Sequence, residues 1–416
     1  RSSAVTAGGL TRRLDAVFLH PIVGPLILTA ILFLMFQAVF AWATPFADGI
    51  EGGIGWLQGL VDGALPDGPV RSFLIEGLLG GVGAVVVFLP QIVILFAFIL
   101  VLEQSGYMTR AAFLMDRLMA SVGLSGRAFI PLLSSFACAI PGIMATRTIA
   151  DPKDRLTTIL IAPLMTCSAR LPVYLVIIAA FIPYRSVGGV ANLQGLVMFG
   201  LYAFGVLSAL LVAWVLRRTV TKGADGGFLM EMPKYQLPQL RDLLIGLWQR
   251  AYAFLRRAGT IILVATMVLW VFASYPVAEE GESQVDASIA GQIGGGLEVV
   301  FAPIGFNKEI AIALVPAMAA REVAVAGLAT VYAIDADDEE LVESELTDRL
   351  SGAWSLPTAL AFLAWFVFAP QCISTFAVTR RETNGYKWPV FMFTYLFAMA
   401  YVGAGITYWV ATWALG

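Results

Sequence analysis

The stretch from Ala162 to Tyr174, APLMTCSARLPVY, lies inside an apolar segment, residues 156–182, that is long enough to cross a membrane. Two prolines interrupt this segment, and a proline inside a helix removes a backbone hydrogen bond and breaks the helix. Cys167 and Arg170 lie between the two prolines. We therefore predict a transmembrane helix that is broken at membrane depth, where irregular backbone is tolerated only beside protein or a watery cavity.

The composition of the whole chain is typical of a membrane protein. Of 416 residues, 59% are hydrophobic and 13% are charged, and the mean hydropathy is +0.82. A water-soluble domain has about 25% charged residues. The net charge of −3 is small and gives no sign of a nucleic-acid partner. Three cysteines exclude a disulfide framework, and a single histidine excludes a His-rich metal cage. The sequence has no GxxxxGKS or GxxxxGKT motif and no hydrolase nucleophile with its base, so we predict a transporter, not an enzyme.

Seven apolar segments are long enough to cross a bilayer, since a membrane helix needs about 20 residues. They are 22–44, 80–102, 156–182, 194–216, 258–275, 356–379 and 388–412. The sixth segment is broken like the third, because Pro370 interrupts it and Cys372 follows. Two further apolar stretches, 128–146 and 310–334, have both flanks on one side of the membrane. We predict that each enters and leaves on the same face as a re-entrant hairpin.

The distribution of lysine and arginine predicts the orientation in the membrane. The 217–257 loop holds eight basic residues against three acidic ones, whereas the 275–297 loop holds four acidic residues and no basic one. We therefore place the N-terminus and 217–257 in the cytoplasm and the C-terminus outside. Residues 45–79 are predicted to form a helix on the outer membrane surface, and the acidic run 335–348 is predicted to form a solvated outer loop.

The order of span, polar link, hairpin and broken span occurs twice, first in 80–183 and again in 258–383. Gly123 and Gly305 open the two hairpins. Because one copy begins outside and the other inside, we predict an all-α polytopic membrane protein of inverted repeats, with two re-entrant gate hairpins and two proline-broken helices. The predicted parts are the linker 1–18, a first helix and surface segment 19–79, the repeats 80–183 and 258–383, a helix and basic loop 184–257, and a last helix 384–416.

All three cysteines fall at the predicted breaks. Cys138 is in the first hairpin, and Cys167 and Cys372 are in the two broken spans. A buried cysteine commonly packs as a small apolar residue, but three of three at breaks favours a functional role. Sulfur selects soft or borderline cations such as Fe²⁺, Mn²⁺, Zn²⁺ or Cu⁺, whereas Mg²⁺ and Ca²⁺ prefer oxygen. We predict that these cysteines are metal ligands along a transport path.

Other polar residues at the breaks are predicted to belong to the path or its gates, because an ionisable residue at membrane depth is costly and usually functional. Glu322 lies in the second hairpin and is predicted as a ligand or gate. Arg170 is predicted as a gate residue or, preferably, as a structural anchor. Ser135, Ser168 and Gln371 provide further oxygen atoms at the hairpin and the breaks.

Several longer blocks of the sequence resemble the membrane domain of FeoB-type ferrous iron transporters. They are LHP (19–21), GVGAVVVFLPQ (81–91), EQSGYM (103–108), FLMDR (113–117), FIPLLS (129–134), PGIMATRT (141–148), APLMTCSARLPVY (162–174) and CISTFAVTRRET (372–383). The resemblance covers nearly the whole chain. It implies import of Fe²⁺ across the bacterial cytoplasmic (inner) membrane, past Cys138, Cys167 and Cys372, and gates similar to those of concentrative nucleoside transporters.

The resemblance also implies cofactors and partners. A typical family member begins with a cytoplasmic GTP-binding domain that uses GTP and Mg²⁺, and no such domain is present in this sequence. We expect no tightly bound cofactor in this chain, with Fe²⁺ as the transported substrate. The expected partners are Fe²⁺, the lipid bilayer, the missing GTP-binding domain and small cytosolic proteins of the family. A homo-oligomer is compatible with the sequence.

Alternative interpretations stay open at this point. Another divalent metal, Mn²⁺ or Zn²⁺, would use the same ligands. A nucleoside-like small solute would use the hairpin sites but would favour Asn, Gln and Glu at the breaks, where Gln371 is the main example. A membrane receptor or scaffold would need no broken helices. The sequence does not decide between channel-like transport and alternating access, or define the coupling energy.

Overall fold

The computed structural model describes residues 9–136, 138–187, 191–221, 235–277, 284–318, 323–332, 339–370 and 372–415. Within these ranges the regular secondary structure is helical except for β1 (Ser186–Val187) and β2 (Ala191–Asn192), which pair antiparallel. The chain divides into two compact units. Unit 1 comprises Arg1–Pro66, Val82–Ala162 and Leu210–Thr260, and unit 2 comprises Asp67–Gly81, Pro163–Ala209 and Ile261–Gly416.

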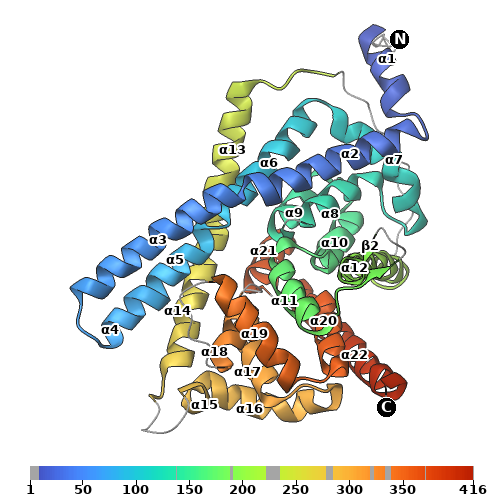
Figure 1. Ribbon diagram of the computed structural model, residues 1–416. Coiled ribbons are helices and arrows are strands. Elements are labelled where there is room, and N and C mark those ends of the chain that lie inside the picture. The colour runs from blue at the N-terminus through green and yellow to red at the C-terminus, as the bar shows by residue number, and fades with distance from the viewer. Residues whose placement is uncertain are drawn as a thin grey trace. The chain divides into compact units, whose positions relative to one another are not determined.

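Unit 1 contains the N-terminal helices and the first hairpin (Figure 1). Its helical segments are α1 (Gly9–Phe18), α2 (Val23–Gln37), η1 (Ala38–Trp42), α3 (Thr44–Ala64), most of α5 (Gly80–Val86), α6 (Leu89–Gln104), α7 (Tyr107–Ser121), η3 (Gly126–Ala128), α8 (Phe129–Ser135), α9 (Ala139–Ala145), η4 (Thr146–Thr148), α10 (Pro152–Ile161), the second part of α12 (Leu193–Thr219), α13 (Leu240–Phe254) and η7 (Leu255–Gly259).

The core of unit 1 forms where α2 and α6 meet the start of α7. Its buried members are Met35, Val39, Leu95, Ile99 and Met108. Helices α6 and α7 meet at 89°, and Gly106 at this corner has φ 79°. This left-handed conformation is accessible to glycine and disfavoured for residues with a Cβ. The glycine therefore permits the sharp corner, and apolar packing holds it in place.

Hairpin 1, defined as α8 and α9, follows this corner, and its two short helices pack against each other. A Cβ on Gly142 of α9 would lie 2.8 Å from the carbonyl oxygen of Pro131 in α8, and still closer to the hydroxyl of Ser135. The close approach of the two arms therefore requires glycine at this position. Residues 128–146 thus contain two short packed helices, and their re-entry on one membrane face stays a prediction.

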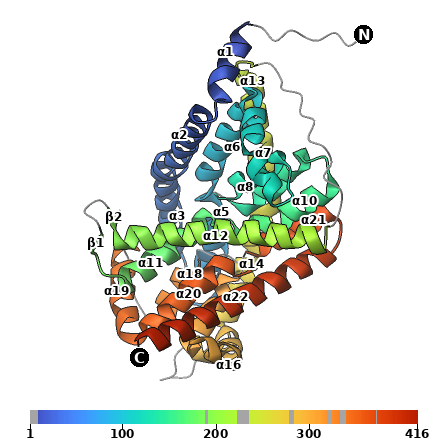
Figure 2. The same ribbon diagram turned by 90° about the vertical axis from the view of Figure 1, so that its right-hand side faces the viewer.

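Unit 2 contains the second hairpin and most of the long C-terminal helices (Figures 1 and 2). Its helical segments are α4 (Pro69–Ser72), η2 (Phe73–Leu79), η5 (Ala162–Leu164, of which Ala162 belongs to unit 1), η6 (Ser168–Arg170), α11 (Leu171–Phe181), the first part of α12, α14 (Thr260–Ser274), α15 (Gln284–Ala287), α16 (Ile289–Phe301), η8 (Ala302–Ile304), α17 (Lys308–Ala317), α18 (Val323–Val331), α19 (Glu339–Ala353), α20 (Leu356–Phe368), α21 (Ile373–Thr383) and α22 (Lys387–Leu415).

Hairpin 2, defined as α17 and α18, also has packed arms and begins at a glycine turn. The helices before and within it, Ile289–Ile304 and Lys308–Ala317, meet at 111°, and Gly305 between them has φ 82°. The ring of Tyr408 in α22 occupies the space beside this turn, because a Cβ on Gly305 would lie only 2.8 Å from the ring Cγ. The long helix α22 therefore covers the turn that opens hairpin 2.

The helices confirm four predicted spans. Among the described residues, Pro152–Phe181, Leu193–Thr219, Leu356–Thr383 and Lys387–Ala414 are long and apolar enough to cross a membrane, and three bent helix pairs raise this number to seven if each is one span. The predicted total of seven spans agrees with the structure only if each bent pair is counted as one span. Even then, the seven segments are not the same as the seven predicted ones. One bent pair contains α16, which was not a predicted span, while α14 has 15 residues and is shorter than the other spans.

Three local predictions were wrong. The segment 80–102 is broken at residues 87–88, because Pro90 belongs to the first turn of α6, a position that proline favours. The segment 45–79 is not one helix, since α3 ends at Ala64 and the helix resumes at Pro69. Part of the acidic run 335–348 forms α19 instead of a loop, and an ion pair between Glu345 and Arg349, four residues apart, supports it.

Candidate transport path at the helix breaks

Each of the three cysteines directly precedes a helical segment. Cys138 precedes α9, Cys167 precedes η6, and Cys372 precedes α21. The backbone is extended at Cys138, with φ −155° and ψ 134°, and at Cys167, with φ −81° and ψ 164°. Cys167 is buried and the other two are half-buried. The prediction that all three cysteines lie at helix breaks is confirmed.

Cys138 lies between the two arms of hairpin 1. Its N–H donates to the carbonyl of Ser134 over 3.2 Å, and its own carbonyl accepts from the N–H of Gly142 over 3.4 Å. Ser135, predicted as part of the path, is fully buried and its hydroxyl donates to the Pro131 carbonyl over 2.9 Å. This bond and the contact with Gly142 give Ser135 a structural role within the hairpin.

At the first broken span, Arg170 bridges the break. Its side chain is fully buried, and Nη2 donates to the carbonyl of Pro163 over 3.0 Å. A break in a helix leaves carbonyls without their usual partners, and the guanidinium supplies one donor from the far side of the break. Arg170 thus connects the two sides of the break through a main-chain carbonyl, and its role as anchor or gate stays a prediction. Ser168, the first residue of η6, is half-buried beside it.

Helix α12 passes close to the same break. A Cβ on Gly205 of α12 would lie 3.0 Å from the hydroxyl oxygen of Thr166 and 3.1 Å from the carbonyl of Leu164. Thr166 is 1% exposed. The break is therefore enclosed by protein on this side, as expected for irregular backbone at membrane depth.

At the second broken span, Cys372 contacts hairpin 2. Its N–H donates to the carbonyl of Met318, the residue after α17, over 3.2 Å. Cys372 has φ 83°, a left-handed conformation that is uncommon for a residue with a side chain and costs about 1–3 kcal/mol. Backbone strain of this kind is concentrated at functional sites. Glu322 and Gln371, predicted to join this site, lie outside the described residues.

The described residues do not form a ready-made metal cage. Across the described parts of the chain, no three His, Cys, Asp or Glu side chains lie close enough to hold one ion. Cys138 belongs to unit 1, whereas Cys167 and Cys372 belong to unit 2.

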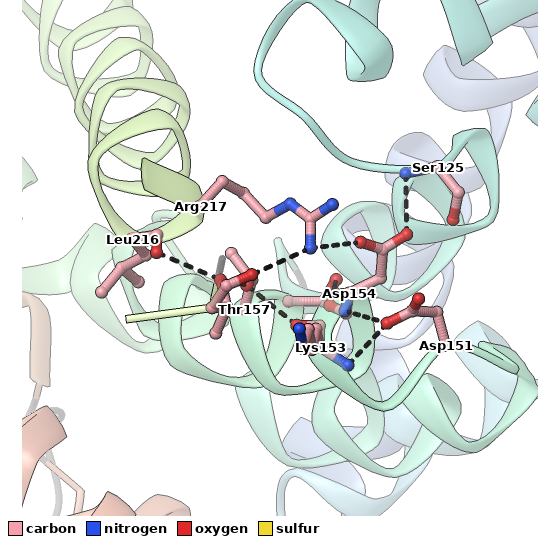
Figure 3. Close-up of polar contacts among 9 residues, drawn as sticks. Ser125, Asp151, Lys153, Asp154, Thr157, Leu216 and Arg217 are labelled. Carbon is pink, nitrogen blue, oxygen red and sulfur yellow. Dashed lines mark hydrogen bonds and ion pairs between the residues drawn. The ribbon is translucent and has the colours of Figure 1, made fainter. Parts of the chain in front are cut away.

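A polar junction in unit 1 fixes the start of the first broken span (Figure 3). Asp154 in α10 pairs with Arg217 near the end of α12 over 3.1 Å and accepts from the N–H of Ser125 over 3.3 Å. The hydroxyls of Thr157 and Thr221 lie 2.8 Å apart in the same junction. The α10 segment is thereby tied to α12 and to the turn before hairpin 1.

This junction was not predicted from the sequence, because Asp154 and Arg217 are far apart in the chain. Arg217 entered the sequence analysis only as one of the basic residues of the predicted cytoplasmic loop. One local signal was available. Asp151 directly precedes Pro152, which is the pattern of a helix start, and the Asp151 carboxylate accepts from the N–H groups of Lys153 and Asp154 over 2.7 and 3.0 Å.

A cavity of about 770 Å³ lies beside hairpin 1 in unit 1. Residues of α6, α7, η3, hairpin 1, η4 and α13 line it, including Met108, Met144 and Arg127. At its rim, Arg250 of α13 pairs with Glu103 of α6 over 3.1 Å. The cavity adjoins hairpin 1 and was not predicted from the sequence.

Comparisons with known proteins identify related sequences. A family model described as Gate, nucleoside recognition, matches residues 85–181 and 255–385, and one described as ferrous iron transport protein B C terminus matches residues 198–250. The chain is 43% identical over 403 residues to the Fe(2+) transporter FeoB of Leptospira interrogans (serovar copenhageni), covering 93% of this chain and 58% of the relative. It is 34% identical over 404 residues to the Campylobacter jejuni Fe(2+) transporter FeoB, covering 95% and 65%.

A third relative is the Fe(2+) transport protein A/Fe(2+) transporter FeoB fusion protein of Porphyromonas gingivalis, 36% identical over 449 residues, covering 98% of this chain and 52% of the relative. The chain thus spans between about half and two thirds of the length of these curated relatives. No solved structure matches the chain.

Proposed function

This chain belongs to the FeoB family of ferrous iron transporters, of which it matches the membrane-spanning part, and from this premise we propose that it forms the path by which Fe²⁺ crosses the bacterial cytoplasmic membrane. The observation that carries the proposal is the position of the three cysteines, each at a helix break. In the whole protein we propose that the family's GTP-binding domain controls this path.

We propose that Cys138, Cys167 and Cys372 contact Fe²⁺ in succession. Sulfur suits a borderline cation, and carbonyls freed at the breaks supply oxygen. The contact between Cys372 and Met318 supports this arrangement, because it joins a broken span to hairpin 2. An ion held by one cysteine at a time can move on, since conduction requires binding that is weak enough to release the ion.

We further propose that the two hairpin regions are inverted repeats that act as gates. Each hairpin has packed arms, begins near a glycine with φ close to 80°, Gly123 or Gly305, and is followed by a broken helix. The Gate family model covers both regions. Inverted repeats with broken helices place the substrate near the membrane midplane in many transporters.

A second candidate substrate follows from the description of the Gate model, which is nucleoside recognition. A nucleoside is neutral and would be held by hydrogen bonds to hairpin residues. The three cysteines favour a metal over a nucleoside. The two substrates are separated by a direct transport comparison.

The experiment is uptake into proteoliposomes under anaerobic, reducing conditions, with Fe²⁺, Mn²⁺, Zn²⁺ and a nucleoside compared. We expect Fe²⁺ uptake, reduced more than tenfold by Cys167→Ser or Cys372→Ser, about 1.4 kcal/mol or more. Cys138→Ser should lower the rate more than the affinity. Met165→Leu, a buried change at the first break that keeps all thiols, is the matched control and should transport normally.

Fe²⁺ binding can be tested separately from transport by its protection of the cysteines against alkylation. Fe²⁺ should slow maleimide labelling of Cys138 and Cys372, which are half-buried. A variant lacking all three thiols that takes up Fe²⁺ at the parental rate would contradict the cysteine path. Oxygen ligands would then have to hold the ion, and Glu322 would be the next residue to change.

A further inference from the structure

A second cavity, of about 860 Å³, lies in unit 2 at the turn between α21 and α22. Figure 2 shows α21 meeting α22 at the end opposite to the C mark of the chain. The lining residues are Ile261 in α14, Ala377, Arg380 and Arg381 in α21, and Asn384, Gly385 and Tyr386 in the turn. The transport path proposed above uses none of these residues.

The polar side of this cavity suits an anion. Arg380 and Arg381 lie in the last turn of α21, and none of the seven described lining residues is acidic. The guanidinium of Arg380 lies 3.9 Å from the ring centroid of Tyr386, so its plane is held over the ring. Arginine presents a rigid fork of donors that matches phosphate oxygens. The amide of Asn384, at a residue with φ 50°, adds a further donor at the rim.

The remaining walls and surroundings suit a molecule with an apolar part. Ile261 and Ala377 form an apolar side of the cavity. Beyond Ile261, α14 exposes Val264 and Val268, and beyond the turn α22 exposes Val390. On α14 the two valines follow Ile261 at helical spacing, so an apolar surface continues from the cavity along this helix, and Val390 adds an exposed apolar side chain on α22.

The turn also carries the residues typical of a membrane–water interface. Tyr386 is 62% exposed, and Lys387 lies 5.2 Å from the ring centroid of Trp388. Aromatic and basic residues of this kind are enriched at headgroup level. A cavity that combines arginines, interfacial side chains and an adjoining apolar surface matches the two parts of a phospholipid. Basic pockets between membrane helices on the cytoplasmic side bind anionic headgroups.

We propose that this cavity is a binding site for one anionic phospholipid, whose phosphate contacts Arg380 and Arg381 and whose acyl chains lie on the exposed faces of α14 and α22. Charge complementarity and the adjoining apolar surface both support a lipid. The same phosphate chemistry would also fit a soluble phosphate ester, so the experiment compares the two sources.

The test measures lipid binding to the purified chain in detergent. Phosphatidylglycerol, phosphatidylcholine and glycerol 3-phosphate are titrated separately, with bound lipid counted by native mass spectrometry and the melting temperature recorded. We expect one phosphatidylglycerol to bind saturably and to raise the melting temperature. Phosphatidylcholine should bind at least tenfold more weakly, and glycerol 3-phosphate should not compete at equal concentration. Equal binding of glycerol 3-phosphate would overturn the lipid assignment.

The variants separate this site from general charge effects. Arg380→Gln/Arg381→Gln should weaken phosphatidylglycerol binding at least tenfold. Arg12→Gln/Arg13→Gln, which removes two adjacent exposed charges from α1, is the matched control and should bind as the parent does. Arg381→Gln alone changes one exposed residue, keeps the Arg380–Tyr386 contact, and should weaken binding about threefold or more. The site would be overturned if Arg12→Gln/Arg13→Gln weakened phosphatidylglycerol binding as much as Arg380→Gln/Arg381→Gln. Unchanged phosphatidylglycerol binding by Arg381→Gln would also overturn it.

Discussion

The junction between α10 and α12 gives the sharpest test of the packing in unit 1. In Arg217→Gln the carboxylate of Asp154 loses its cationic partner while it stays buried. The two side chains are 9% and 10% exposed in the parent. Removing one partner of a buried ion pair costs about 3–5 kcal/mol. Because Asp154 keeps the N–H of Ser125, we expect the lower end, about 3 kcal/mol.

The reverse change, Asp154→Asn, should cost less. Arg217 still donates to the carbonyl of Thr221 over 3.3 Å, so we expect a loss of about 2 kcal/mol. With both charges removed, no buried ion is left without a partner, and the double variant should also lose about 2 kcal/mol. The coupling energy between the two positions is then about 3 kcal/mol, within the range for residues in one network.

The assay is unfolding in mixed micelles, followed by helical circular dichroism as denaturing detergent is titrated. Arg218→Gln is the matched control, because it makes the same change one residue along, at an exposed side chain that lies over Trp214. It should cost under about 1 kcal/mol. Two results would contradict a stabilising ion pair at this junction: Arg217→Gln loses no more stability than the control, or the double variant loses as much as the two single variants together.

Three further changes test other contacts. Asp15→Asn removes the carboxylate that lies 3.0 Å from the buried Arg110. Amide hydrogen exchange in α1 should then become about tenfold faster or more. Unchanged exchange would contradict the contact. Gly142→Ala should destabilise the protein by about 1–3 kcal/mol through overpacking in hairpin 1, and Ser135→Ala should partly restore the loss in a double-variant unfolding measurement. Arg170→Met removes the donor to the carbonyl of Pro163, and the melting temperature should fall clearly. An unchanged melting temperature would contradict a structural role for Arg170 at the break.

Features set by local chemistry were predictable from the sequence. Pro163 and Pro370 interrupt hydrogen bonding within their own helices, so both breaks could be located without knowledge of the rest of the fold. Gly123 and Gly305 both have φ near 80°, as expected for residues that open tight turns. The same local rule was not applied to Pro90, which lies in the first turn of α6, so hydropathy alone made the segment 80–102 continuous.

Features set by distant partners could not be predicted in this way. Arg217 and Asp154 are far apart in sequence, and no periodicity connects them. The cavity beside hairpin 1 exists because five helices, α6, α7, α8, α9 and α13, surround it, which is a property of packing. For the predicted path, the helix breaks at the cysteines could be predicted, but the contact of Cys372 with Met318 depends on how α17 meets the second break.

The ring of Tyr408 over Gly305 has a consequence for how the protein is made. Hairpin 2 begins at Gly305, but the side chain that covers this turn belongs to α22, which is synthesised after α18, α19, α20 and α21. Membrane helices enter the bilayer in the order in which the ribosome delivers them, and earlier segments fold first. Hairpin 2 must therefore wait in the membrane with its opening turn uncovered until α22 arrives.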